Sequence, residues 1–368
     1  MKIGREFTFL CSLPQGLRQL LHALKCRPPV TASLLRLIIL LTVPARLVSQ
    51  VPESPDTTRI ISYSDRFIIK ANLNTQDDSY FYTDKVNGQQ LKVSPNIETR
   101  MFLSLDYEFI GVSFGFSPDF LNANNDEASK GKTSFADYQF RLFLGKWVQT
   151  LQYRNIKGYY IDNTGDFVPD WQEGVDPYLQ FPDLRSRTFR MGTSYVFNPR
   201  FSYRNVVYQT EWQKKSAGSF VPTFIYDYHH FSIREEGLES VEHNLNFRIA
   251  PSYFHTFVWR ENWFFSVQAS PSVGLRFANV RETSDGEFTK QGRTYFTRFL
   301  EGGMQLGYSS DRVIFGASFN LNVNWYNEGR EASVENDQYY GLLYIGYRFN
   351  APGFIDRPMK KLSAATND

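Results

Sequence analysis

The sequence predicts a transmembrane antiparallel up-and-down β-barrel of about 12 strands (roughly 10–14). Six stretches alternate apolar and polar residues one for one over about ten residues or more. Aromatic residues make up 17% of the chain, yet the mean hydropathy is only −0.39. Because every second residue of a membrane-spanning strand faces a polar lumen, such a barrel combines aromatic girdles with a polar average composition.

The clearest alternating stretch runs from Val313 to Trp325. Its odd positions are apolar, while its even positions include Asn320, Asn322 and Asn324. Successive side chains of a strand point to opposite faces, so the three amides share one face. They would be costly in a dry core but not in a polar lumen. The stretch is also longer than the roughly 5–6 residues of an ordinary strand. We therefore favour a membrane barrel over a soluble antiparallel sandwich.

Residues 1–49 are predicted to form a signal or leader segment. The apolar run 34–43 is too short to span a bilayer and suits the central region of a signal peptide. The long stretch before it leaves open a translation start further downstream. Both Cys11 and Cys26 lie in this segment, so the mature chain would contain no disulfide and no thiolate metal site.

The rest of the chain divides into a periplasmic approach segment at 50–65 with no strand pattern, a barrel at 66–349 and a C-terminal tail at 350–368. The predicted strands span 66–73, 97–107, 110–117, 134–145, 147–158, 187–197, 201–211, 219–231, 244–257, 262–277, 293–308, 312–325 and 338–349. A single-chain bacterial barrel has an even number of strands. One of these thirteen, either between 197 and 244 or at the start, is therefore expected to be wrong, which leaves twelve.

The connections alternate in length. Short turns are predicted near Glu108, Lys146, Asn198, Arg260 and Ser310. Longer loops are predicted at 118–133, 159–186, 278–292 and 326–337. Outer-membrane barrels have short periplasmic turns and long external loops. The last strand ends on the terminal-strand aromatic Phe349, as is common in such proteins.

Three segments carry a resemblance to a known family. They are residues 209–220 (QTEWQKKSAGSF), the opening YSDR at 63–66, and residues 254–265 around the turn WRENW. The chain resembles an uncharacterised Bacteroidota outer-membrane barrel family, the domain of unknown function DUF4421, over most of residues 60–350. The resemblance implies an outer-membrane barrel of unassigned role. It supplies no catalytic residues. The strand pattern and the terminal Phe349 predict a Gram-negative outer-membrane location, contact with outer-membrane lipid and insertion by the barrel assembly machinery.

The segment around Lys214, Lys215 and Gly218 is predicted to be a tight polar turn between two strands. One interpretation gives the two lysines an anion or lipid-headgroup contact. The other, which we favour, is a plain turn in which Gly218 permits an unusual backbone conformation.

An enzyme interpretation rests on His230 and Ser232. Residues two apart on a strand share a face, so a His–Ser pair of a lipid esterase or deacylase is geometrically possible. Several acidic residues follow, namely Glu235, Glu236, Glu239 and Glu242. The signal is weak, because any His-x-Ser in a strand satisfies it. The remaining histidines, including His229, His243 and His255, show no metal-ligand spacing.

We therefore predict a non-enzymatic barrel with an envelope, transport or structural role, and no cofactor or metal. The net charge of +2 is too small to indicate nucleic-acid binding. The predicted lumen-facing arginines are Arg141, Arg248, Arg276, Arg312 and Arg348, accompanied by Asp106, Asp137, Glu301 and the asparagines. They form either a wall that selects solutes or an internal network that fills the barrel. Strand number does not decide between these, and we favour the filled lumen.

Overall fold

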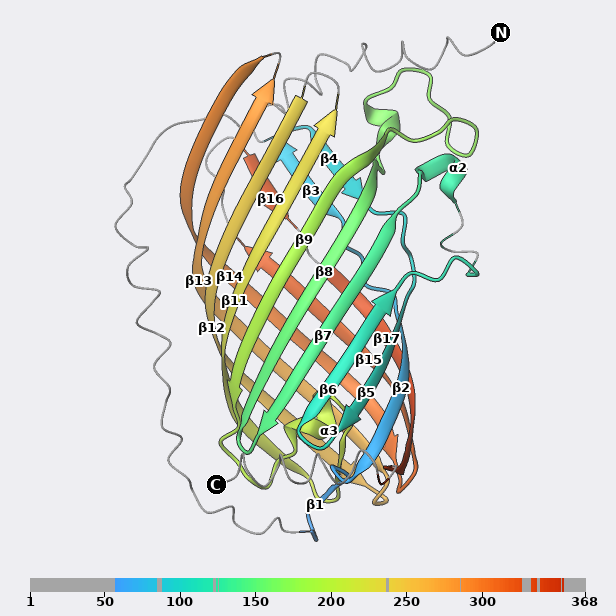
Figure 1. Ribbon diagram of the computed structural model, residues 1–368, viewed down its shortest axis with the longest axis vertical. Helices are drawn as coiled ribbons and strands as arrows, with labels where there is room; N and C mark the ends of the chain where they lie inside the picture. Colours follow the sequence, from blue (N-terminus) through green and yellow to red (C-terminus); the bar gives the residue numbers. More distant parts are fainter. Residues whose placement is uncertain are drawn as a thin grey trace.

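A computed structural model describes residues 57–84, 88–121, 124, 126–235, 238–284, 286–325, 332–335, 338–351 and 353. The leader predicted at 1–49 and nearly all of the predicted tail lie outside these residues. The described chain forms a tall closed β-barrel (Figure 1). Among these residues, no helix has both the length and the apolar composition needed to cross a membrane.

Twelve antiparallel strands form the barrel wall. They are β2 (Arg66–Asn74), β5 (Arg100–Tyr107), β6 (Ile110–Phe116), β7 (Ser134–Leu144), β8 (Trp147–Ile161), β9 (Gln180–Tyr195), β11 (Ala217–Glu235), β12 (Leu238–Trp259), β13 (Trp263–Ser284), β14 (Glu287–Ser309), β15 (Val313–Trp325) and β17 (Gln338–Asn350). Each wall strand pairs with its neighbours along the chain, and pairing of β2 with β17 closes the barrel. The predicted up-and-down barrel of twelve strands is confirmed.

The two ends of the barrel differ. The turns near Glu108, Lys146, Asn198, Arg260 and Ser310 all lie at the end where β2 begins and β17 ends. We call this the short-turn end and the opposite one the long-loop end. In barrels of this kind the short turns face the periplasm.

One predicted strand, 201–211, is wrong. This stretch forms the short helix α3 (Tyr203–Val207) followed by β10 (Glu211–Gln213). The Ser202 side chain accepts a hydrogen bond from the backbone N–H of Asn205 at 2.9 Å, which caps the helix N-terminus. The approach segment 50–65, predicted to lack a strand, contains β1 (Ile60–Ser62), which pairs with β10. Figure 1 shows α3 and β1 at the short-turn end.

Two predicted loops are shorter than expected: strands enter both ends of 159–186, and 278–292 is almost entirely strand. β8 continues to Ile161 and β9 begins at Gln180, while β13 and β14 are separated only by residues 285–286. The same end carries the hairpin of β3 (Tyr80–Asp84) and β4 (Gln90–Ser94), the strand β16 (Ala332–Glu335) paired with β3, the helix α2 (Glu127–Lys130) and the 3-10 turn η4 (Thr164–Asp166). The predicted number of strands is therefore correct, but the predicted strand ends at the long-loop end are not.

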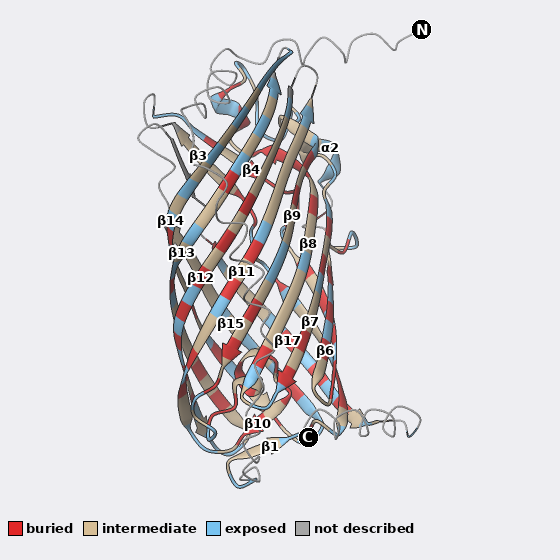
Figure 2. Cartoon of the chain, turned by 60° about the vertical axis from the view of Figure 1, so that its left-hand side comes forward, coloured by how far each residue is buried: buried red, intermediate tan, exposed pale blue. Residues whose placement is uncertain are grey.

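The outer face of the wall is apolar. Phe319, Ile249 and Ile345 are 45%, 59% and 61% exposed. Figure 2 shows buried and more exposed positions alternating along the wall strands. Aromatic rings gather outside the short-turn end, with Trp147 and Tyr195 4.9 Å apart. An apolar band bordered by aromatic residues is the surface that a lipid bilayer covers.

Candidate functional site in the barrel lumen

A plug occupies the lumen at the short-turn end. The plug is residues 198–216, the connection between β9 and β11 that contains α3 and β10. Lys70 of β2 donates to the carbonyl oxygen of Tyr208, and Arg348 of β17 donates to that of Gln209 at 3.1 Å. Arg204 donates outward from the plug to the carbonyl oxygen of Glu108 at 3.0 Å. These charge-assisted bonds hold the plug to the wall.

Apolar packing also holds the plug against the barrel wall. Phe201 and Val206 of the plug belong to a buried cluster with Val221 of β11 and Phe254 of β12. The plug is therefore packed against the wall at this end of the lumen.

A buried ion cluster lies beside the plug on the β2–β7 side of the wall. The carboxylate of Asp106 lies 3.4 Å from the Lys70 ammonium and 3.1 Å from the Arg141 guanidinium. All three side chains are at most 6% exposed. We call Lys70, Asp106 and Arg141 the Asp106 cluster. Gly111 makes room for it, because a Cβ atom there would overlap the Asp106 carboxylate.

Above the plug the lumen contains a cavity of about 980 Å³. Residues 206–209 of the plug line it at one end, and Glu282 and Gln291 line it toward the long-loop end. Its wall combines charged and amide side chains with apolar ones such as Phe102, Leu184 and Phe231, and it includes residues from β2, β7, β8, β9, β11–β15 and β17. The cavity thus has its floor at the plug and extends toward the long-loop end.

Strand register places polar side chains of the cavity wall in rows. Cross-strand pairing aligns Gln152 of β8 with Arg190 of β9, and Arg190 with Asp227 of β11. The row continues from Asp227 to Asn246 of β12 and then to Arg276 of β13. Residues far apart in the sequence therefore lie side by side on the wall. We call this row of residues the belt.

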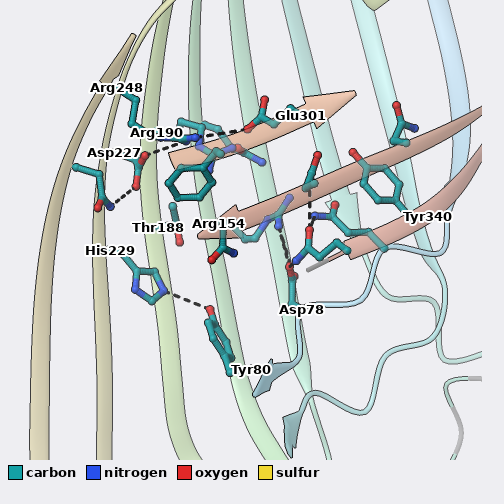
Figure 3. Close-up of a pocket in the computed structure, with 18 of the residues that line it drawn as sticks. Asp78, Tyr80, Arg154, Thr188, Arg190, Asp227, His229, Arg248, Glu301 and Tyr340 are labelled. Atoms are coloured by element: carbon teal, nitrogen blue, oxygen red, sulfur yellow. Dashed lines mark hydrogen bonds and ion pairs between the residues drawn. The ribbon is translucent and has the colours of Figure 1, made fainter. Parts of the chain in front are cut away.

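The belt contains an ion cluster centred on Asp227 (Figure 3). Asp227 accepts from the Asn246 amide at 2.6 Å and from the Arg248 guanidinium at 3.4 Å. Arg248 also lies 3.7 Å from Glu301 of β14, and Arg276 donates to the Asn246 side-chain oxygen at 2.8 Å. We call these five residues the Asp227 cluster.

A second network holds the loop between β2 and β3 against the wall. Asp78 of this loop lies 2.8 Å from Arg100 and 3.2 Å from Arg154, and it accepts from Gln338 at 3.2 Å. Arg154 also contacts the buried Asp137 at 2.8 Å. Side chains from three wall strands, β5, β8 and β17, thus contact the carboxylate of Asp78.

His229 faces the cavity on the same strand as Asp227. Its Nε2 lies 2.8 Å from the Ser186 hydroxyl and 3.4 Å from the Tyr80 hydroxyl, as Figure 3 shows for Tyr80. Ser186 is buried. The sequence analysis did not assign His229 to the lumen.

Most of the predicted lumen residues lie inside the barrel. Those that line the cavity or are buried beside the plug are Arg141, Arg248, Arg276, Arg348, Asn320, Asn322 and Asn324. Arg312 is the exception, because it is exposed in the turn after β14 and donates to the hydroxyl of the outward-facing Tyr347 at 3.4 Å. The alternating pattern does not fix a side chain at a turn, where the strand geometry ends.

The lumen residues that the sequence analysis did not single out are Lys70, Asp78, Arg100, Arg154, Arg190 and Asp227. For Arg154, Arg190 and Asp227 the signal was available, because each shares the inward phase of its strand. Asp78 lies in a loop, where no periodicity applies.

His230 and Ser232 lie on the outer phase of β11, not in the lumen. The His230 ring packs 4.8 Å from that of His243, and no hydrogen bond joins it to Ser232 among the described residues. Glu239 is tied to Arg234 at 2.6 Å, and Glu242 lines the cavity on the other face. Glu239 and Glu242 are therefore engaged elsewhere, and Glu236 lies outside the described residues.

At the turn motif the structure contradicts the unusual backbone conformation predicted for Gly218. Lys214 lies 3.4 Å from the Glu261 carboxylate and 3.8 Å from the centre of the Trp212 ring. Gly218 is already within β11, and its φ is not positive. A Cβ atom there would come within 2.5 Å of His255 Nδ1 and of the Tyr253 hydroxyl oxygen. Close packing, not an unusual backbone conformation, requires glycine.

Within the described part of the chain, no group of three or more His, Cys, Asp or Glu side chains is placed to hold a metal ion. The polar groups of the lumen instead contact one another in the two networks and at the plug. What the site offers chemically is a cavity lined by charged and amide side chains, with the plug at one end.

A closed antiparallel barrel of twelve strands, apolar outside and polar within, is a β-barrel of the outer-membrane type. The chain belongs to the family described as a domain of unknown function, DUF4421, whose match covers residues 54–349. No curated protein matches the chain.

Several solved barrels are similar to it at low sequence identity. OmpT, an outer membrane protein of Vibrio cholerae, is 10% identical with a TM-score of 0.30, over 77% of this chain and 98% of that one. An outer membrane channel from Pseudomonas putida F1 is 10% identical with a TM-score of 0.33, over 78% and 96%. LpxR from Salmonella typhimurium is 11% identical with a TM-score of 0.30, over 77% and 100%.

Proposed function

We propose that this protein is an integral barrel of a Gram-negative outer membrane that is closed on the periplasmic side and takes up a polar solute into its lumen from the outer side. Its role is non-enzymatic. It contacts outer-membrane lipid through its apolar band and reaches the membrane through the barrel assembly machinery.

The plug is the observation that carries this proposal. Lys70 and Arg348 reach it from two strands, and its apolar residues pack against β11 and β12. Removing a buried charged group from its partners costs several kcal/mol, so the plug does not leave its site readily. A lumen with such a floor can bind a solute from one side, but it is not a permanently open diffusion pore.

The non-enzymatic assignment has two supports. His230 and Ser232 lie on the outer phase with no acidic partner among the described residues, although such a pair needs an oriented base. Inside the lumen, Ser186 contacts His229 but is buried and does not line the cavity. The serine hydroxyl that contacts His229 is therefore out of reach of a solute in the cavity.

Single-channel recording in planar bilayers tests the proposal. Protein purified from the outer-membrane fraction should give no steady conductance. A variant without residues 199–216 should conduct, because it lacks the floor of the cavity. The cut ends lie together, since the Asn198 amide donates to the carbonyl oxygen of Gly218 at 2.7 Å, so a two-glycine turn can join them.

A shift of gel mobility on boiling will show that the shortened barrel is folded, and Lys215→Gln, at an exposed position of the plug, is the matched control and should stay closed. Steady conductance by the wild-type protein would overturn the proposal whatever the shortened variant does. Release of fatty acid from phospholipid by the same preparation, lost in both His230→Ala and Ser232→Ala, would establish the enzyme interpretation instead.

A further inference from the structure

We infer that the cavity binds a small organic anion rich in hydroxyl groups, of the sugar-acid or sugar-phosphate class, and that Arg190 binds its anionic group. The inference rests on the proposed function, because it requires a cavity that a solute enters from one side. It adds the chemical class of the solute and the residue that recognises it.

Arg190 differs from the other arginines of the lumen. Arg100, Arg248 and Arg348 are at most 1% exposed, and each has a carboxylate or carbonyl partner. Arg190 is exposed and lines the cavity, and within the described chain it has no hydrogen bond or ion pair. Figure 3 shows it among Asp227, Arg248 and Glu301. A guanidinium with open donors is the group that binds carboxylate or phosphate in a two-pronged geometry.

The charges around Arg190 do not balance. Three guanidinium groups, those of Arg190, Arg248 and Arg276, share this part of the wall with two carboxylates, those of Asp227 and Glu301. Asp227 is opposite Arg190 in the strand register, but its oxygens accept from Asn246 and Arg248. The surplus of one positive charge favours a ligand that carries one negative charge.

Amides beside Arg190 suit the neutral part of such a ligand. Gln152 is its partner in the neighbouring strand, and Gln139 is the next residue in the row. Gln152 donates an N–H to Asp137 at 2.7 Å, and Gln139 does so at 3.2 Å. Within the described chain, the side-chain oxygens of both glutamines accept no hydrogen bond. Amide side chains offer donors and acceptors to hydroxyl groups.

The volume of the cavity and the acidic residues near its long-loop end limit which anions can bind. The volume of about 980 Å³ lies within the range of roughly 300–1,000 Å³ that is usual for small-ligand sites. Glu242 and Glu282 line the cavity toward the long-loop end. Their charges disfavour a large polyanion, so a compact anion of one or two sugar units fits best.

Isothermal titration calorimetry on the purified mature protein tests this inference, with glucuronate, glucose 6-phosphate and glucose as probes. At least one anion should bind, and glucose should bind at least tenfold more weakly. Arg190→Gln should weaken binding of the anion at least tenfold, and Arg190→Lys should retain part of the affinity because it keeps the charge. Arg187→Gln is the matched control, since Arg187 is on the same strand but on the outer phase, paired with His230.

Binding of glucuronate alone would identify a carboxylate ligand, and binding of glucose 6-phosphate alone a phosphate ligand; either result supports the inference. Absence of binding by both anions would overturn it, as would equal affinity of wild type and Arg190→Gln, or an equal loss in Arg187→Gln. The boiling shift will show that each variant is folded. Failure to bind by a barrel that is closed in planar bilayers would overturn this inference alone, whereas steady conductance would overturn the proposed function.

Discussion

The two halves of the lumen use the same inward-facing polar residues in different ways. At the short-turn end, Lys70 and Arg348 donate to backbone carbonyls of the plug and are almost completely buried. In the cavity, Glu301 pairs with Arg248 while its side chain remains 34% exposed. Alternation of polar and apolar residues therefore specifies which side chains point inward, but not whether their partners are the plug backbone or other wall residues, nor how far each remains exposed.

The largest expected effect is at the dry end. Asp106→Asn leaves Lys70 and Arg141 buried without their carboxylate, and breaking a buried ion pair in this way costs about 3–5 kcal/mol. The urea midpoint of the folded barrel should fall accordingly. An unchanged midpoint would mean that water reaches this cluster and that the two halves do not differ.

A smaller effect is expected from a methyl group at the dry end. In Gly111→Ala the new Cβ would overlap the Asp106 carboxylate and come within 2.7 Å of Arg141 Nε. Overpacking of this kind costs about 1–3 kcal/mol. Thermal unfolding of this variant should be compared with that of Gly341→Ala, near the long-loop end, where the nearest atom is 3.8 Å away. Equal losses in the two variants would show that the tight packing is not confined to the plugged half.

The smallest effect is expected in the cavity. Glu301→Gln should change the free energy of unfolding by less than about 1 kcal/mol, because Glu301 is partly exposed and the buried Arg248 keeps Asp227 as a partner. Added salt should narrow the difference further by screening the wild-type pair. A loss as large as that of Asp106→Asn, measured by the same urea titration, would show that the cavity wall is as dry as the plug.

The membrane-spanning part of the fold was predictable from sequence. A strand such as β15 must present apolar residues to lipid and polar residues to the lumen, so its hydrophobic pattern has a period of two. Beyond the membrane neither face needs to be apolar. The upper parts of β13 and β14, which were predicted to be a loop at 278–292, therefore lack the pattern although they pair without interruption.

The plug was missed for a different reason. Its stretch 201–211 has enough aromatic and β-branched residues to resemble a strand. The spacing of Tyr203, Val206 and Val207, at i, i+3 and i+4, was the available sign of a helix. The ion clusters depend on strand register and on the path of the Asp78 loop, and neither is encoded in local periodicity. Arg312 was misplaced because it lies at a turn.

The two wall residues that donate to the plug, Lys70 and Arg348, lie on the two strands that close the barrel. Lys70 belongs to the first wall strand and Arg348 to the last, and they bind the carbonyls of the adjacent residues Tyr208 and Gln209. Gly346 gives Lys70 its room, since a Cβ there would lie 2.6 Å from the Lys70 Cγ. The plug thus bridges the seam where β2 meets β17. A segment from the middle of the chain therefore ties together the first and last strands of the closed barrel.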